Sequence, residues 1–110
     1  MFRKASQDGY VPAVAGITRK TLVHGEKTLL GEFHLSKGSL LPSHSHPNEQ
    51  TGYLVSGRMR LIVNGEPFEV EPGDSWSIPA DVEHRAEIIE DSVAFEVFSP
   101  VRADYLDPDQ

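Results

Sequence analysis

The amino-acid sequence predicts an all-β fold of antiparallel strands, either a small barrel or a double-sheet jelly roll. Short strand-like runs follow one another along the chain, and turn-forming residues separate them. No stretch of helical length shows the 3.6-residue apolar period of an amphipathic helix. About eight such strands in 110 residues are typical of these two architectures.

The strands are expected at short, regular intervals. They cover residues 14–23, 28–35, 53–57, 59–63, 68–70, 75–78, 84–89 and 93–98. Asn64-Gly65 is the strongest hairpin signal, because a two-residue turn of this kind matches the twist of the strands that it joins. The turn places four side chains on one face, which we expect in the core: Met59, Leu61, Phe68 and Val70. Pro67 lacks an N–H and predicts that the returning strand lies at a sheet edge.

Composition limits the classes of function. The chain has 17 acidic and 10 basic residues, a formal net charge of −7 and no basic stripe, which argues against nucleic acid and anionic membranes as partners. No apolar run approaches a membrane span or a signal-peptide core, so we expect a cytoplasmic protein that binds a small molecule. We expect one domain over residues 1–110, with a barrel core at about 28–99, an N-terminal strand and a C-terminal tail.

Three histidines and a glutamine form a candidate site for one divalent metal ion. His44 and His46 lie two residues apart, so on an extended strand both side chains project from one face. Pro47 interrupts regular pairing beyond them, which lets Gln50 turn back and offer its amide oxygen. His84, on a later strand, would close the site from across the sheet. Because the chain has no cysteine, the ligands must be nitrogen and oxygen atoms.

Glycine and proline residues frame these histidines at fixed spacings. The two stretches read Gly38-x5-His44-x-His46-x3-Gln50-x6-Gly57 and Gly73-Asp74-x4-Pro79-x4-His84. Together they resemble the two motifs of the cupin superfamily. The resemblance implies a jelly-roll barrel and one divalent ion, of nickel, zinc, manganese or iron, on His44, His46, Gln50 and His84. Gln50 stands in place of the usual glutamate, and Glu49 is the alternative if it turns inward instead.

A glutamine ligand would change the chemistry of such a site. Three neutral imidazoles and a neutral amide leave the charge of the metal uncompensated, so the metal is a stronger Lewis acid and suits an anionic substrate. The set also departs from the two-histidine, one-carboxylate arrangement of oxygen-activating iron. A metal-dependent cupin dioxygenase and a non-catalytic sugar-binding cupin remain the alternatives.

The C-terminal strand and tail carry a second group of candidate residues. Glu96 and Phe98 share one strand face, and Pro100 ends the strand so that Arg102 can fold back across its end. An ordinary structural role fits the same pattern, with Glu96 in a surface ion pair and Phe98 in the core. Tyr53 and Trp76 line the pocket or pack in the core, and for Trp76 we favour the core.

The same C-terminal segment carries a closer resemblance. The ending Phe98-Ser99-Pro100-x-Arg102-x-Asp104-Tyr105-Leu106, together with the histidine motifs, is similar to small cupins that linearise 4,5-unsaturated monouronates from pectin and alginate. The resemblance implies an anionic sugar-acid substrate and a catalytic group of Glu96, Phe98 and Arg102 beside the metal. Position 96 departs from the pattern, in which we expect aspartate rather than the longer glutamate.

The last predicted strand also bears on assembly, because it is apolar on both faces. Its side chains on one face are Val93, Phe95 and Val97, and those on the other are Ala94, Glu96 and Phe98. A sheet that is apolar on both sides needs a second partner, which favours a homodimer packed through the outer faces. Alternatively, the N-terminal segment of the same chain covers that outer face.

Overall fold

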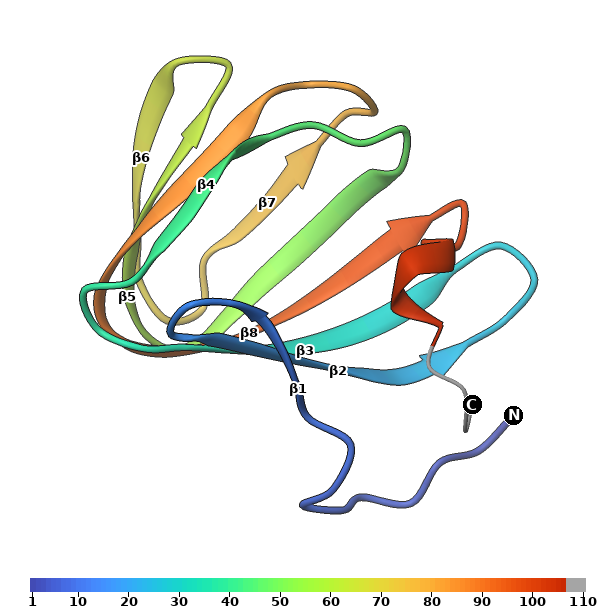
Figure 1. Ribbon diagram of the computed structural model, residues 1–110. Coiled ribbons are helices and arrows are strands. Elements are labelled where there is room, and N and C mark those ends of the chain that lie inside the picture. Colours follow the sequence, from blue (N-terminus) through green and yellow to red (C-terminus); the bar gives the residue numbers. More distant parts are fainter. Residues whose placement is uncertain (107–110) are drawn as a thin grey trace.

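The computed structural model describes residues 1–106, and these form eight strands and one short 3-10 helix (Figure 1). The strands are β1 Val11–Val14, β2 Ile17–His24, β3 Leu29–Leu35, β4 Leu40–His44, β5 Glu49–Val63, β6 Glu66–Val70, β7 Ser75–Ile78 and β8 His84–Ser99, and the helix is η1 Ala103–Tyr105. All strand pairs are antiparallel. The all-β prediction is therefore confirmed, and the part of the tail beyond residue 106 lies outside the described residues.

Two layers share the long strands β5 and β8. The strands are bonded in the order β1-β2-β3-β8-β5-β6, with β4 also on β8 and β7 also on β5. The second half of β8 pairs with β3 and with the first half of β5, whereas the first half of β8 pairs with β4 and with the second half of β5. Figure 1 shows the two long strands curving from one layer into the other. This shape is a double-sheet jelly roll.

The curvature arises where β5 crosses from one layer to the other. The β5–β8 register shifts at three places between Leu54 and Met59. Gly57 lies at this bend with a φ of +93°, and a Cβ there would meet the Asp91 carbonyl oxygen at 2.3 Å and Ser92 Oγ at 2.2 Å. Sequence analysis expected separate strands on either side of residue 58 and of residues 90–92. That was wrong, because β-bulges bend a strand without ending its ladder.

The Asn64-Gly65 hairpin forms as expected and contributes most of its predicted core. Both turn residues have positive φ, and Leu61 pairs with Phe68 across the hairpin. Met59, Leu61 and Val70 are buried, but Phe68 is 46% exposed, so its assignment to the core was wrong. Val70 on the same face of the edge strand β6 is buried, so the opposite layer covers this face at Val70 but not at Phe68, nearer the turn. The edge position that Pro67 predicts is confirmed, because β6 has a neighbouring strand on one side only.

The N-terminal residues cover part of the outer surface. Arg3 Nη1 donates to the Thr21 carbonyl oxygen at 2.8 Å, and Lys20 Nζ donates to the Ser6 carbonyl oxygen at 2.9 Å. Further along, the Tyr10 hydroxyl donates to the Glu32 carboxylate on β3. The segment therefore lies on β2 and β3 and does not contact β8 through these bonds, so the alternative that it covers the outer face of the last strand was wrong. The outer face that β5 and β8 share stays partly exposed. Within residues 1–106, no helix has the length and apolar character needed to cross a membrane.

Replacing Gly57 by alanine should destabilise the fold. The new methyl group would meet backbone and side-chain atoms of β8, and an L side chain is strained at this φ. We expect the free energy of unfolding to fall by about 2 kcal/mol or more, measured by urea denaturation. Gly25→Ala is the matched control, because a Cβ at Gly25 meets nothing within 4 Å. Equal stability of the two variants would contradict this account of the bend.

Candidate metal centre

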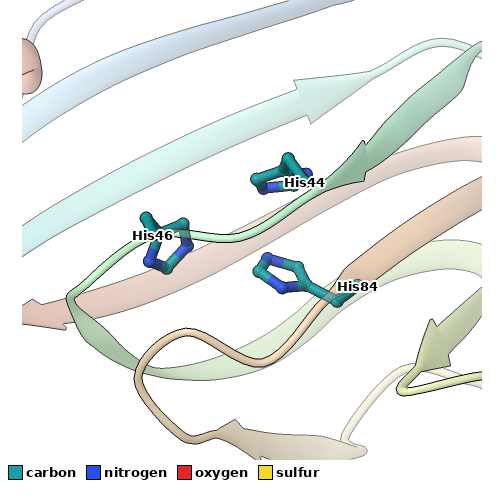
Figure 2. A group of neighbouring side chains, drawn as sticks. All are labelled: His44, His46 and His84. Carbon is teal, nitrogen blue, oxygen red and sulfur yellow. The ribbon is translucent and has the colours of Figure 1, made fainter.

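The side chains of three histidines point toward one another (Figure 2). His44 ends β4, His46 lies in the connection to β5, and His84 begins β8. The β4–β8 pairing places His44 directly opposite His84, and their ring centroids are 4.1 Å apart. Candidate ligand atoms of the three side chains all lie within 4.8 Å of one another. The group can therefore contribute three nitrogen atoms to one metal ion.

A backbone carbonyl fixes the orientation of each imidazole. The Nδ1–O distances are 2.8 Å from His44 to Pro42, 2.9 Å from His46 to Asn48 and 2.9 Å from His84 to Val82. A carbonyl oxygen can only accept, so Nδ1 must carry the proton in all three rings. In the neutral rings Nε2 therefore keeps its lone pair, the arrangement that metal-binding histidines generally adopt.

The environment of His46 and His84 favours the neutral form of their rings. His84 Nε2 is buried and has no hydrogen-bond partner within residues 1–106. Burial lowers the pKa of His84 to about 4, and burial also lowers the pKa of His46, with a further contribution from the positive charge of Arg102. A buried acceptor without a donor is costly, and a cation at this point would remove the cost. The residues present thus fit a divalent metal ion.

Gln50 adds an oxygen atom on the side of His46. Gln50 is buried whereas Glu49 is exposed, so the glutamine faces the histidines. Its Oε1 lies 2.7 Å from His46 Nε2, and its Nε2 donates to Glu96 Oε1 at 2.6 Å. The second bond fixes the amide orientation, which leaves two acceptors facing each other beside the histidines. A positive ion shared by both atoms accounts for this contact.

The predicted catalytic residues line the same cavity. Glu96, Phe98 and Arg102 share it with His44 and His84, together with Gln50 and Trp76. The Phe98 ring packs edge-on against the His46 ring at 5.8 Å, and the Arg102 guanidinium carbon lies 5.1 Å from the Phe98 ring centre. Burial raises the pKa of Glu96, although hydrogen bonds from Trp76 and Gln50 and the charge of Arg102 oppose the shift. Sequence analysis left a surface ion pair open for Glu96, and the structure does not support it.

The C-terminal turn holds the Arg102 side chain in place. Nε and Nη2 donate to the two carboxylate oxygens of Asp104 at 3.2 and 2.8 Å, and Nη1 donates to the Tyr105 hydroxyl at 3.0 Å. The guanidinium carbon also lies 3.9 Å from the Tyr105 ring centre. Asp104 therefore occupies one edge of the guanidinium. Each terminal nitrogen carries two N–H groups, so Nη1 and Nη2 each keep one donor beyond these bonds.

Comparison with known proteins places this geometry in a family. A model described as "Cupin domain" matches residues 31–99. The chain belongs to the cupin family. It is 29% identical over 93 residues to the pectin degradation protein KdgF of Dickeya dadantii, an alignment that covers 83% of this chain and 84% of the relative.

Solved cupin structures resemble the whole chain. The structure of KdgF from Halomonas sp. has a TM-score of 0.90 at 29% identity and covers 96% of this chain and 98% of its own. An RmlC-like cupin from Shewanella frigidimarina has a TM-score of 0.89 at 26% identity, with 96% and 95% covered. The similarity to these structures covers nearly the whole chain, including the jelly roll and its three histidines.

Two contacts of this cupin site were not predicted from the sequence, although Trp76 was considered as a residue that could line the pocket, which it does. Trp76 packs against the core, as expected, but its indole Nε1 also donates to Glu96 Oε1 at 2.9 Å. Tyr105 lines the cavity and contacts both Phe98, at 5.4 Å between ring centres, and Arg102. Neither role is visible from spacing. Gly52 has no side chain, but only the β5–β7 register shows that it lies next to Trp76.

Replacing one histidine should remove the metal from the purified protein. We expect His44→Ala and His84→Ala to lose most of the bound metal, since each removes one of three convergent nitrogens. Elemental analysis after dialysis measures the result. The control is His24→Ala, which lies on β2 outside this group and should keep the metal content of the wild type. Full metal retention in both site variants would refute the site.

Proposed function

We propose that this cupin converts 4,5-unsaturated monouronates into their linear keto form, with one metal ion held by His44, His46, Gln50 and His84. The observation that carries the proposal is that Glu96 and Arg102 line the same cavity as His44, Gln50 and His84. Relatives named for pectin degradation support the substrate class, an anionic sugar acid. A cytoplasmic location stays a prediction from the sequence.

The reaction needs proton transfer and charge stabilisation but no redox step. The substrate is a cyclic enol ether with a carboxylate beside its double bond. Opening of the hemiacetal removes the proton of its hydroxyl group, breaks the bond between that carbon and the ring oxygen, and returns a proton to the ring oxygen, which gives an aldehyde and an enol. Addition of a proton at C4 and loss of the enol O–H proton then give the ketone, so the product is an isomer. The bound metal would supply a Lewis acid that stabilises negative charge on substrate oxygen atoms.

Glu96 is the proposed proton-transfer group. It lies beside Gln50 in the cavity, and burial raises the pKa of its carboxyl group. A raised pKa brings a carboxylic acid nearer to the working pH, where it can both accept and release a proton. The glutamate is longer than the aspartate expected at this position, and its length reaches both Gln50 and Trp76.

Arg102 and Phe98 are the proposed binding groups. The remaining N–H groups of Nη1 and Nη2 are suited to a carboxylate, because two parallel N–H donors match its two oxygens. Asp104 holds the Nε–Nη2 edge and so limits the rotation of the guanidinium. Phe98 is a core residue with 1% of its surface exposed, as the structural alternative expected, and it lies between His46 and Arg102. Only the part of its ring that lines the cavity would contact a sugar ring.

Two variants should separate the proposed roles. Glu96→Gln should lower kcat about 10²-fold or more, because an amide cannot exchange the proton. Arg102→Ala should mainly raise KM, because a carboxylate clamp holds the ground state and the transition state alike. Turnover of an unsaturated galacturonate, followed by absorbance with and without chelator, measures both.

The controls are matched in charge and lie outside the cavity. Glu49→Gln changes an exposed glutamate beside Gln50, and Arg58→Ala removes an exposed arginine that pairs with Glu71. Both should keep wild-type turnover. Wild-type turnover in both site variants, or an inactive metal-loaded wild type, would contradict the proposal. Oxygen uptake on adding iron would instead favour the dioxygenase, and binding without turnover would favour the sugar-binding protein.

We also propose that the protein forms a homodimer through the outer face of β5 and β8. The register places Tyr53 beside Phe95 on this face, and Val55 follows two residues along β5. Tyr53 and Val55 are 49% and 43% exposed. In a chain of net charge −7, an uncharged apolar face is the part of the surface where a second copy meets no charge repulsion.

A charge on this face should prevent dimer formation. We expect the wild type to have twice the 12.2 kDa chain mass by light scattering, and Tyr53→Glu to have the mass of one chain. Phe68→Glu is the control, since Phe68 is equally exposed but lies on the edge strand β6. A monomeric wild type, or a Tyr53→Glu dimer, would contradict this interface.

A further inference from the structure

Three strands place Trp76, Gly52 and Glu96 in one row across the sheet. In the β5–β7 register Gly52 pairs with Trp76, and in the β5–β8 register Gly52 pairs with Glu96. The strand β5 therefore lies between the tryptophan and the carboxylate. Despite this separation, Trp76 Nε1 donates to Glu96 Oε1 at 2.9 Å.

Gly52 makes this contact possible. A Cβ at Gly52 would meet the Trp76 indole atoms Cε2, Nε1 and Cζ2 at 2.2, 2.3 and 2.4 Å. The indole thus occupies the space that a side chain at Gly52 would fill. Any other residue at this position would push the indole away from Glu96.

Both donors to Glu96 use the same oxygen atom. Gln50 Nε2 donates to Oε1 at 2.6 Å and Trp76 Nε1 donates to Oε1 at 2.9 Å. No hydrogen bond within residues 1–106 reaches Oε2. Two N–H donors on one oxygen fix the carboxylate plane and leave the second oxygen facing the cavity that Glu96 lines.

We propose that Trp76 is a positioning residue that, with Gln50, holds Oε1 of Glu96 so that Oε2 is the oxygen that exchanges protons with the substrate. Gly52 supplies the space for the indole. The catalytic part of this statement rests on the proposed function, whereas the hydrogen bond itself does not. Trp76 touches no reacting atom and acts through Glu96.

The first test uses the indole N–H as a reporter. Trp76 is the only tryptophan in the chain, so its Nε1–H gives one resonance in an ¹H–¹⁵N spectrum. Glu96→Gln keeps an oxygen acceptor and should leave this proton protected. Glu96→Leu removes the acceptor and should speed its hydrogen exchange by about tenfold or more. An indole proton that exchanges freely in the wild type, or is unchanged in Glu96→Leu, would overturn the proposal.

The second test separates positioning from structure. Trp76→Phe keeps an aromatic side chain but loses the donor. We expect kcat to fall about tenfold or more, with KM within about twofold of the wild type and one metal ion still bound. Wild-type kcat in Trp76→Phe would overturn the positioning role.

A double-variant cycle tests the part played by Gly52. Gly52→Ala should displace the indole and lower kcat as Trp76→Leu does. The combined variant should be no slower than Trp76→Leu alone, because both changes break the same bond and leucine ends before the atoms that the methyl group would meet. Additive losses would overturn the role of Gly52. If the wild type turns over no unsaturated uronate, the proposed function fails, and the indole resonance alone decides whether Trp76 holds Glu96.

Discussion

The long antiparallel pairing of β5 with β8 is the interaction on which the rest of the molecule depends. The two strands pair from Glu49 with Ser99 to Val63 with His84, and the bulges around Gly57 turn both from one layer into the other. Because β8 contributes to both layers, it carries His84 at one end and Glu96 near the other. The bend brings both residues to a single cavity, which a straight strand of 16 residues could not do.

Gln50 connects the histidine group with Glu96, the proposed proton-transfer group. Its amide offers an oxygen to the side of His46 and a donor to Glu96. A glutamate at this position would place a second carboxylate against Glu96, with the repulsion of like charges at short range. With a glutamine at position 50, the carboxylate of Glu96 lies next to the proposed metal ligands and is not itself one of them. A carboxylate in that place remains available for proton transfer.

The C-terminal turn completes the cavity from outside the sheet. Arg102, Asp104 and Tyr105 hold one another, and the Arg19 guanidinium carbon on β2 lies 4.3 Å from the Tyr105 ring centre. Burial raises the pKa of the Asp104 carboxyl group. The hydrogen bond and the positive charge of Arg102 lower it by more, so the pKa lies below its ordinary value. The anchored turn thus keeps a cationic group over Phe98 in a chain whose overall charge is negative.

Local sequence signals were enough to predict most of the strands, the Asn64-Gly65 turn and the histidine motif. The alternation of apolar residues, the residue types of a turn and the spacing of ligands each depend on a few neighbouring residues. They could not decide whether Glu49 or Gln50 faces the histidines, since adjacent residues on a strand point to opposite sides and only the pairing with β8 selects one. Phe68 failed as a core residue for a related reason. Alternation gives the face of a strand, but the opposite layer decides whether that face is covered. The contact of Trp76 with Glu96 across Gly52 depends on the register of three strands, which only the tertiary structure sets.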